Sequence, residues 1–215
     1  RNENLMKKLI ISIMNKVKLF TLSIFFISLF GMVSCNNDDP VDKYMPPTPD
    51  EVKAAFERVK GNYTGKLVYE KENFTRKSSQ NDTVDINCQI TNDSTFIIKS
   101  FPSKLLALNV KNKTLKEAIS KADSQDITCR IRFYKTNPIV MIVNPLTPTF
   151  DLTYKNAKHR VMTPFYINNA YSFARQGEKE QLFVQIVEAV IVVDGKQIEE
   201  LPRGNLFKFL LSSIR

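Results

Sequence analysis

Long stretches of this sequence alternate apolar and polar residues with a period of two, and this alternation constrains the fold more than any other feature. Residues 84–90 read VDINCQI and residues 127–133 read ITCRIRF, with every second side chain apolar. Successive side chains of a β-strand point to opposite faces, so this period is typical of strands with one buried face. The sequence therefore predicts a sheet built mainly from half-buried strands.

Other segments repeat the strand pattern, and two dipeptides predict the turns between strands. Strand patterns occur at residues 62–70, 94–101 and 138–145 and across the last third of the chain. Asn92-Asp93 and Asp194-Gly195 lie between such segments and favour tight hairpin turns. The spacing of strands and turns is typical of an antiparallel arrangement.

Two segments follow a helical period instead. Residues 48–61, TPDEVKAAFERVKG, place Thr48 as a helix N-cap, with Glu51 three residues later and a glycine after the last turn. Within residues 103–122, Thr114 and Glu117 form a second capping-box pattern. The predicted fold is mainly β, of the α+β class. It is an antiparallel β-barrel or sandwich with an N-terminal helix and one or two short helices inserted between strands.

The first 34 residues have the layout of a secretory signal peptide. Leu19–Phe30 is an apolar run that follows Lys16 and Lys18 and precedes small residues, and Met14 is an alternative start for the segment. About 12 apolar residues are too few to cross a bilayer, which takes about 20 in a helix. The alternative is an N-terminal membrane anchor that stays attached.

The residues MVSC, ending at Cys35, resemble the lipobox of bacterial lipoproteins. The resemblance implies cleavage before Cys35 and attachment of acyl chains to its thiol. Residues 35–48 are polar and proline-rich and would form a flexible tether, and residues 49–215 would form a single β-rich domain. At 215 residues with 43% hydrophobic content, the chain fits one such domain.

Other short motifs resemble those of Bacteroidota lipoproteins. Asp38 and Asp39 are similar to the acidic export tag of that group, which implies the outer membrane and exposure at the cell surface; the alternatives are a solvated linker and the periplasmic face. DTV and DST, with Thr83 and Ser94 as acceptors, resemble its O-glycosylation sequon. GNYTGKLVY resembles the first strand of lipocalin-like barrels. The whole layout is similar to lipoprotein domains of gut Bacteroidota, which implies no particular activity.

Several classes of function find no support in the residues. The formal net charge is +9, but cations and aromatic residues do not interleave in a basic run, so we expect no nucleic-acid partner. His159 is the single histidine and falls in a predicted exposed turn, which leaves no base for a catalytic triad and no zinc-ligand spacing. We therefore predict no catalytic residues, no metal and no cofactor.

Five residues remain as candidates for chemistry or binding. Cys88 and Cys129 lie on apolar strand faces, where they form either a disulfide or two buried thiols. Glu188 interrupts the apolar run LFVQIVEAVIVV; it is either a buried carboxylate that marks a pocket or, the favoured alternative, a solvent-facing side chain. Arg130 and Arg132, with Lys135 beside them, form a basic stripe that would hold an anionic ligand or be a solvated face.

These features lead to one function hypothesis and two alternatives. The leading hypothesis is a lipid-anchored cell-envelope protein whose non-catalytic β-rich domain binds a glycan, a small apolar ligand or a partner protein. The first alternative is a hydrolase that uses Glu188 and a second carboxylate, which requires the two groups to face each other. The second is a structural or assembly component of the outer membrane, which would expose a large apolar patch.

Overall fold

The computed structural model describes residues 44–71, 81–168, 170–178 and 180–214, with only the backbone described at 199–203. The predicted signal peptide, Cys35 and residues 36–43 of the predicted tether lie outside these residues. Met45–Arg215 forms one compact unit. No helix in the described part of this chain is long and apolar enough to span a membrane.

A single antiparallel sheet contains all ten strands of the described residues, in the order β10-β1-β2-β3-β4-β5-β8-β9-β7-β6. The strands are β1 (Gly61–Glu70), β2 (Asn81–Asn92), β3 (Thr95–Phe101), β4 (Gln125–Thr136), β5 (Ile139–Pro145), β6 (Thr149–Tyr154), β7 (Ala157–Met162), β8 (Phe173–Gln176), β9 (Gln181–Val193) and β10 (Lys196–Ile214). The predicted mainly β fold is confirmed.

The sheet closes on itself, so of the two predicted arrangements the structure is the barrel. β10 pairs with β1 on one side and with β9 on the other, which makes a closed barrel of eight strands. The β6–β7 hairpin extends the sheet from the far half of β9, where Val161 pairs with Val193. Closure removes the free edges of the eight barrel strands.

Large apolar side chains fill the barrel. Leu67, Ile98, Ile139, Phe207 and Phe209 have no solvent-accessible surface, so no water-sized space lies against them. An eight-stranded barrel is just wide enough for side chains to fill its interior or to hold one small ligand. At these five positions the interior is filled by the protein itself.

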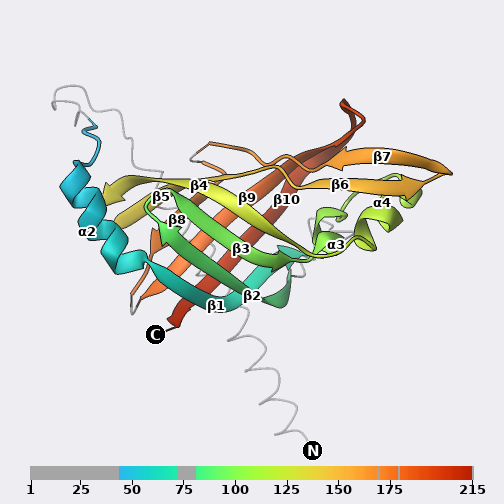
Figure 1. Cartoon of the computed structure of the whole chain (residues 1–215). Coiled ribbons are helices and arrows are strands. Elements are labelled where there is room, and N and C mark those ends of the chain that lie inside the picture. Colours follow the sequence, from blue (N-terminus) through green and yellow to red (C-terminus); the bar gives the residue numbers. More distant parts are fainter. Residues whose placement is uncertain (1–43, 72–80, 169, 179, 215) are drawn as a thin grey trace, which may run out of the picture. The chain divides into compact units, whose positions relative to one another are not determined.

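The helix predicted from residues 48–61 is confirmed as α2 (Pro49–Val59), on one side of the barrel in Figure 1. The Thr48 side chain accepts a hydrogen bond from the Glu51 N–H at 3.4 Å, and the Glu51 carboxylate accepts one from the Thr48 N–H at 2.7 Å. This reciprocal capping box satisfies two N–H groups of the first turn. The buried face of α2 packs on the core, where Tyr63 donates its hydroxyl to the Val59 carbonyl oxygen.

Removing the cap should weaken the domain measurably. We expect Thr48→Ala to lower the free energy of unfolding by about 1 kcal/mol, because the two hydrogen bonds of the Thr48 hydroxyl, from the Glu51 N–H and to the Glu51 carboxylate, are lost but are exposed and partly replaced by water. Urea denaturation followed by circular dichroism measures the change. Thr48→Ser keeps the hydroxyl and should restore most of the loss; an equal loss in both variants would contradict the capping role.

Two short helices, α3 (Ser103–Leu106) and α4 (Lys113–Ser120), lie on the other side of the barrel below the β6–β7 hairpin (Figure 1). Leu115 and Ile119 of α4 are buried, as the helical stripe predicts. The predicted cap at Thr114 is wrong. Asn112 is the N-cap and accepts a hydrogen bond from the Leu115 N–H at 3.1 Å, since asparagine is the stronger capping residue.

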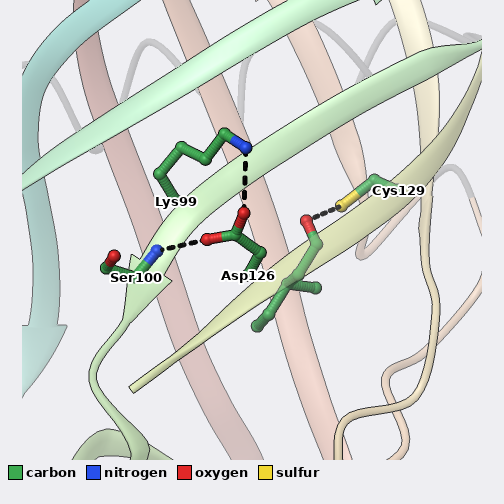
Figure 2. Close-up of polar contacts among 5 residues, drawn as sticks. Lys99, Ser100, Asp126 and Cys129 are labelled. Carbon is green, nitrogen blue, oxygen red and sulfur yellow. Dashed lines mark hydrogen bonds and ion pairs between the residues drawn. The ribbon is translucent and has the colours of Figure 1, made fainter.

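A β-bulge near the start of β4 carries the polar contacts shown in Figure 2. Ser100 has a positive φ of 49°, and its N–H donates to the Asp126 carboxylate at 2.8 Å. Lys99 binds the other carboxylate oxygen at 2.9 Å, and this bond, followed by that of Ser100, lowers the pKa of Asp126. Asp126 therefore fixes the bulge from the exposed side of the sheet.

Candidate functional site

Arg130 and Arg132 stand next to one another on the outer face of β4. Ile127, Cys129, Ile131 and Phe133 point into the barrel, as predicted, so the two arginines between them point outward, and both are exposed. Among the described residues neither arginine forms an ion pair. If the β3–β4 register is extended into the turn, Asp93 lies opposite Arg132, yet these two described residues form no ion pair with each other. Their two positive charges are therefore available to an anionic group.

Asn144 lies between these arginines and the start of β8. It pairs with Arg130 across the β4–β5 ladder, and its neighbour Val143 donates its N–H to the Ser172 carbonyl oxygen at 3.2 Å. The register of β5 and β8, extended from Ile142–Phe173, brings Tyr171 opposite Asn144. The Asn144 Oδ1 atom is buried without a hydrogen-bond partner, which is unusual for a polar atom.

The segment before β8 presents aromatic and aliphatic side chains to solvent. Tyr166, Ile167 and Tyr171 are 39%, 68% and 47% exposed. The two tyrosine rings lie 5.0 Å apart between centroids, with 34° between their planes. Exposed apolar groups of this size, gathered within six residues, are typical of a contact surface.

Hydrogen bonds connect the described residues of this exposed segment to one another and to β9. The Asn168 side chain accepts from the Tyr171 N–H at 3.2 Å, Tyr166 donates its N–H to the Val187 carbonyl oxygen at 2.9 Å, and Gln185 donates to the Tyr171 carbonyl oxygen at 3.2 Å. These bonds connect the backbone of both tyrosines to neighbouring residues.

We call Arg130, Arg132, Asn144, Tyr166 and Tyr171 the outer-face site. Its cations, amide and aromatic rings can hold an anionic or stacking ligand; they include no carboxylate and no nucleophile with an adjacent base. The sequence indicated both arginines through their strand parity. It missed the other three residues, although PFYINNAYS, with its aromatic residues in a turn-rich stretch, was a signal for the loop.

Glu188 is fully buried, so the favoured prediction of a solvent-facing side chain is wrong. It lies on β9 opposite Asn205 of β10, on the face that points into the barrel. Phe165 forms an isolated bridge with Glu188 on the other side. A four-residue excursion in β10 between Glu200 and Asn205 changes which side chains of β9 face inward, and this break cannot be seen in the apolar run alone.

A chain of amides connects Glu188 to the segment between α3 and α4. The Asn205 side chain donates to the Glu188 Oε2 atom at 2.7 Å and to the Leu108 carbonyl oxygen at 2.9 Å, and it accepts from Asn109 at 2.9 Å. The Glu188 Oε1 atom has no partner among the described residues. Burial raises the pKa of Glu188 well above its usual range, and the bond from Asn205 offsets only part of this effect.

This geometry connects the barrel to the helical segment and does not resemble a hydrolytic centre. Asn205, an amide, is the side chain bonded to Glu188 in the described part of the chain, whereas a glycosidase mechanism needs a second carboxylate about 5 to 9.5 Å away in a cleft. The arrangement therefore gives no support to the hydrolase alternative.

Cys88 and Cys129 are buried free thiols, the second of the two sequence interpretations. The two strands do not adjoin: Cys88 pairs with Ile98 and Cys129 with Phe96, both on the intervening strand β3. Two strand spacings of about 4.8 Å exceed the roughly 7 Å that a disulfide bridges between Cα atoms. Burial raises the pKa of both thiols, and Cys129 directs its sulfur to the Ile127 carbonyl oxygen (Figure 2).

His159 lies within β7 rather than in the predicted turn. Its Nδ1 atom is 2.8 Å from the Asp194 carboxylate, and its ring stacks on Tyr154 with centroids 4.2 Å apart. The bond to His159 lowers the pKa of Asp194. The cluster ties the tip of the β6–β7 hairpin to the turn between β9 and β10.

The remaining predictions concern the glycosylation acceptors and metal ligands. Thr83 and Ser94 are exposed, on β2 and in the β2–β3 turn, and their glycosylation stays a prediction. Nowhere in the described ranges do three or more histidine, cysteine, aspartate or glutamate side chains gather as metal ligands.

These observations define the molecule as a closed antiparallel β-barrel with added helices and strands. Residues 58–193 match the family described as Domain of unknown function (DUF4840), and because the match covers more than half of the chain, the protein belongs to that family. The matched range runs from the end of α2 to the end of β9 and contains the whole outer-face site. No curated protein and no solved structure matches the chain.

Proposed function

We propose that this protein is a lipid-anchored envelope protein whose barrel binds its ligand on the outer face. The observation that carries the proposal is the contrast between the two surfaces of the barrel. The interior is filled by side chains such as Phe207 and Phe209, whereas the outer face combines unpaired arginines with exposed tyrosines whose rings lie against each other. A binding role without catalysis suits this distribution of groups.

Anchoring through Cys35 would hold the domain close to a bilayer. The signal-like segment followed by MVSC supports lipidation, and two or three acyl chains give stable attachment where one alone is marginal. The tether of residues 36–48 would reach roughly 40 Å when fully extended. The domain could then bind envelope components within that distance of the membrane, and Asp38 and Asp39 support placement at the cell surface.

Loss of the anchor thiol should block maturation of the protein. We expect Cys35→Ala to leave the signal segment uncleaved before residue 35 and to abolish acylation, because the lipobox reaction needs the thiol. Fractionation and mass spectrometry of the product measure both effects. Asn36→Ala, one residue further, should still be cleaved, acylated and recovered with the envelope; an acylated, envelope-bound Cys35→Ala product would contradict the proposal.

The proposal places the ligand outside the barrel, and this separates it from a small apolar ligand held inside. The resemblance of the first strand to lipocalin-like barrels stays a prediction, and the filled interior gives no support to a ligand inside the barrel. A double variant of Arg130→Gln and Tyr171→Ala tests the location. The double variant should no longer bind the ligand, whereas its unfolding transition should have the same midpoint as that of the native barrel.

A further inference from the structure

The outer-face site extends across β4, β5 and the segment before β8, which are neighbours in the sheet. A short oligomer could contact all three at once. Arg130 and Asn144 are cross-strand partners, and Tyr171 follows on the other side of Asn144. Two strand spacings separate the backbones of Arg130 and Tyr171, or about 10 Å. This width suits a few linked monomer units, with one on the tyrosine and the next toward the arginines.

The two arginines define the charge of the ligand. Arg130 and Arg132 lie two residues apart on the same face of β4. Neither forms an ion pair in the part of the chain that the structure describes. A guanidinium group donates a planar pair of hydrogen bonds that matches carboxylate and sulfate oxygens. Two such groups suit one or two acidic substituents. They are too few for the basic groove that a nucleic-acid backbone requires.

The tyrosines define the shape of the ligand. Tyr171 presents an exposed ring that Tyr166 and the Asn168 turn hold in place. A pyranose ring has a flat face of C–H groups and a rim of hydroxyls, so it stacks on an aromatic face while its rim stays hydrated. Tyrosine offers the same combination of an apolar face and a polar tip.

Asn144 lies between Arg130 and Tyr171 and carries an unsatisfied acceptor, which is covered by protein atoms in this structure. Its Oδ1 atom is an acceptor that lacks a donor. A sugar hydroxyl donates a hydrogen bond, whereas a carboxylate, sulfate or phosphodiester oxygen only accepts. A hydroxyl that displaces the atoms covering Oδ1 would satisfy it.

We propose that the outer-face site binds an acidic carbohydrate, with a sugar ring on Tyr171, a hydroxyl at Asn144 and a carboxylate or sulfate group on Arg130 and Arg132. The inference rests on the proposed outer-face binding and specifies its ligand class. It separates this site from the buried Glu188 cluster, which takes no part in it.

Calorimetry with the purified mature protein tests the inference. The probes are an oligogalacturonate, a sulfated oligosaccharide of the same length, a neutral oligogalactose and a single-stranded oligothymidylate. We expect binding of at least one acidic oligosaccharide. Arg130→Gln should weaken that binding by about tenfold or more and Tyr171→Ala by a similar factor, whereas Tyr171→Phe retains the ring and should retain most of the affinity.

Lys158→Gln provides the matched control, because it removes the same charge from β7, away from the outer-face site. It should leave the affinity within about twofold after correction for ionic strength. Binding of the neutral sugar as tightly as the acidic one, with sensitivity to Tyr171 alone, overturns the acidic class but keeps outer-face binding. Tighter binding of the oligothymidylate, or no binding of any acidic oligosaccharide, overturns the inference. Acidic binding that survives both Arg130→Gln and Tyr171→Ala overturns outer-face binding itself.

Discussion

Glu188→Gln should become increasingly stable relative to the native protein as the pH rises from 4.5 toward neutrality. Burial raises the pKa of Glu188 well above its ordinary value of 4.5, so the folded protein keeps the carboxyl group protonated where the unfolded chain ionises. The stability that this group contributes is present below the unfolded pKa and is lost as the pH rises toward the folded pKa. The glutamine side chain does not ionise, so Glu188→Gln does not lose this stability as the pH rises.

The expected difference grows by about 1.4 kcal/mol for each pH unit in that window, until the native Glu188 itself ionises. Urea denaturation of both proteins at a series of pH values measures it. Glu117→Gln is the control, because Glu117 is an exposed carboxylate paired with Lys121 and its pKa is lowered, so its removal should give no such rise. Parallel stability curves for the native and Glu188→Gln proteins would show that Glu188 does not titrate as its burial requires.

Gly65→Ala should prevent the barrel from closing correctly. A Cβ atom at Gly65 would overlap the carbonyl oxygen of Leu210 on β10, and a backbone atom within a strand cannot move aside as a flexible side chain can. We expect a loss of about 3 kcal/mol or more in the free energy of unfolding, or failure to fold. Thermal and urea denaturation measure the loss.

Thr64→Ala provides the matched control on the same strand. Thr64 is exposed, so its substitution should change the free energy of unfolding by about 0.5 kcal/mol or less. If Gly65→Ala unfolded with the stability of the native protein, β1 and β10 could not approach as closely as the structure shows. Separating the two strands by a few tenths of an ångström would not relieve the overlap, because the Cβ atom would still lie far inside the contact distance of the Leu210 carbonyl oxygen.

Local sequence signals predicted the elements that depend only on neighbouring residues. The α2 cap lies in Thr48 and Glu51, three residues apart, and the inward positions of β4 follow from alternation alone. Arg130 and Arg132 were placed on the outer face by the same parity. Even so, the Asn112 cap was missed because Thr114 with Glu117 offered a competing pattern two residues further on.

Features that depend on distant partners could not be read from the sequence. Whether Glu188 is buried depends on Asn205 in the next strand and on Asn109 in the connection between the helices. The choice between barrel and sandwich depends on pairing between β1 and β10. The joint position of Asn144 and Tyr171 depends on how β8 returns to β5 after the β6–β7 excursion.

The seam between β1 and β10 has a consequence for the order of folding. Asn62 pairs with Ile214, so the contact that completes the cylinder joins residues almost at opposite ends of the domain in sequence. Contacts of such long range make a chain fold slowly, because loop-closure entropy is lost before the contacts form. Until the segment that forms β10 has paired, β1 and β9 each lack one neighbouring strand and the cylinder stays open.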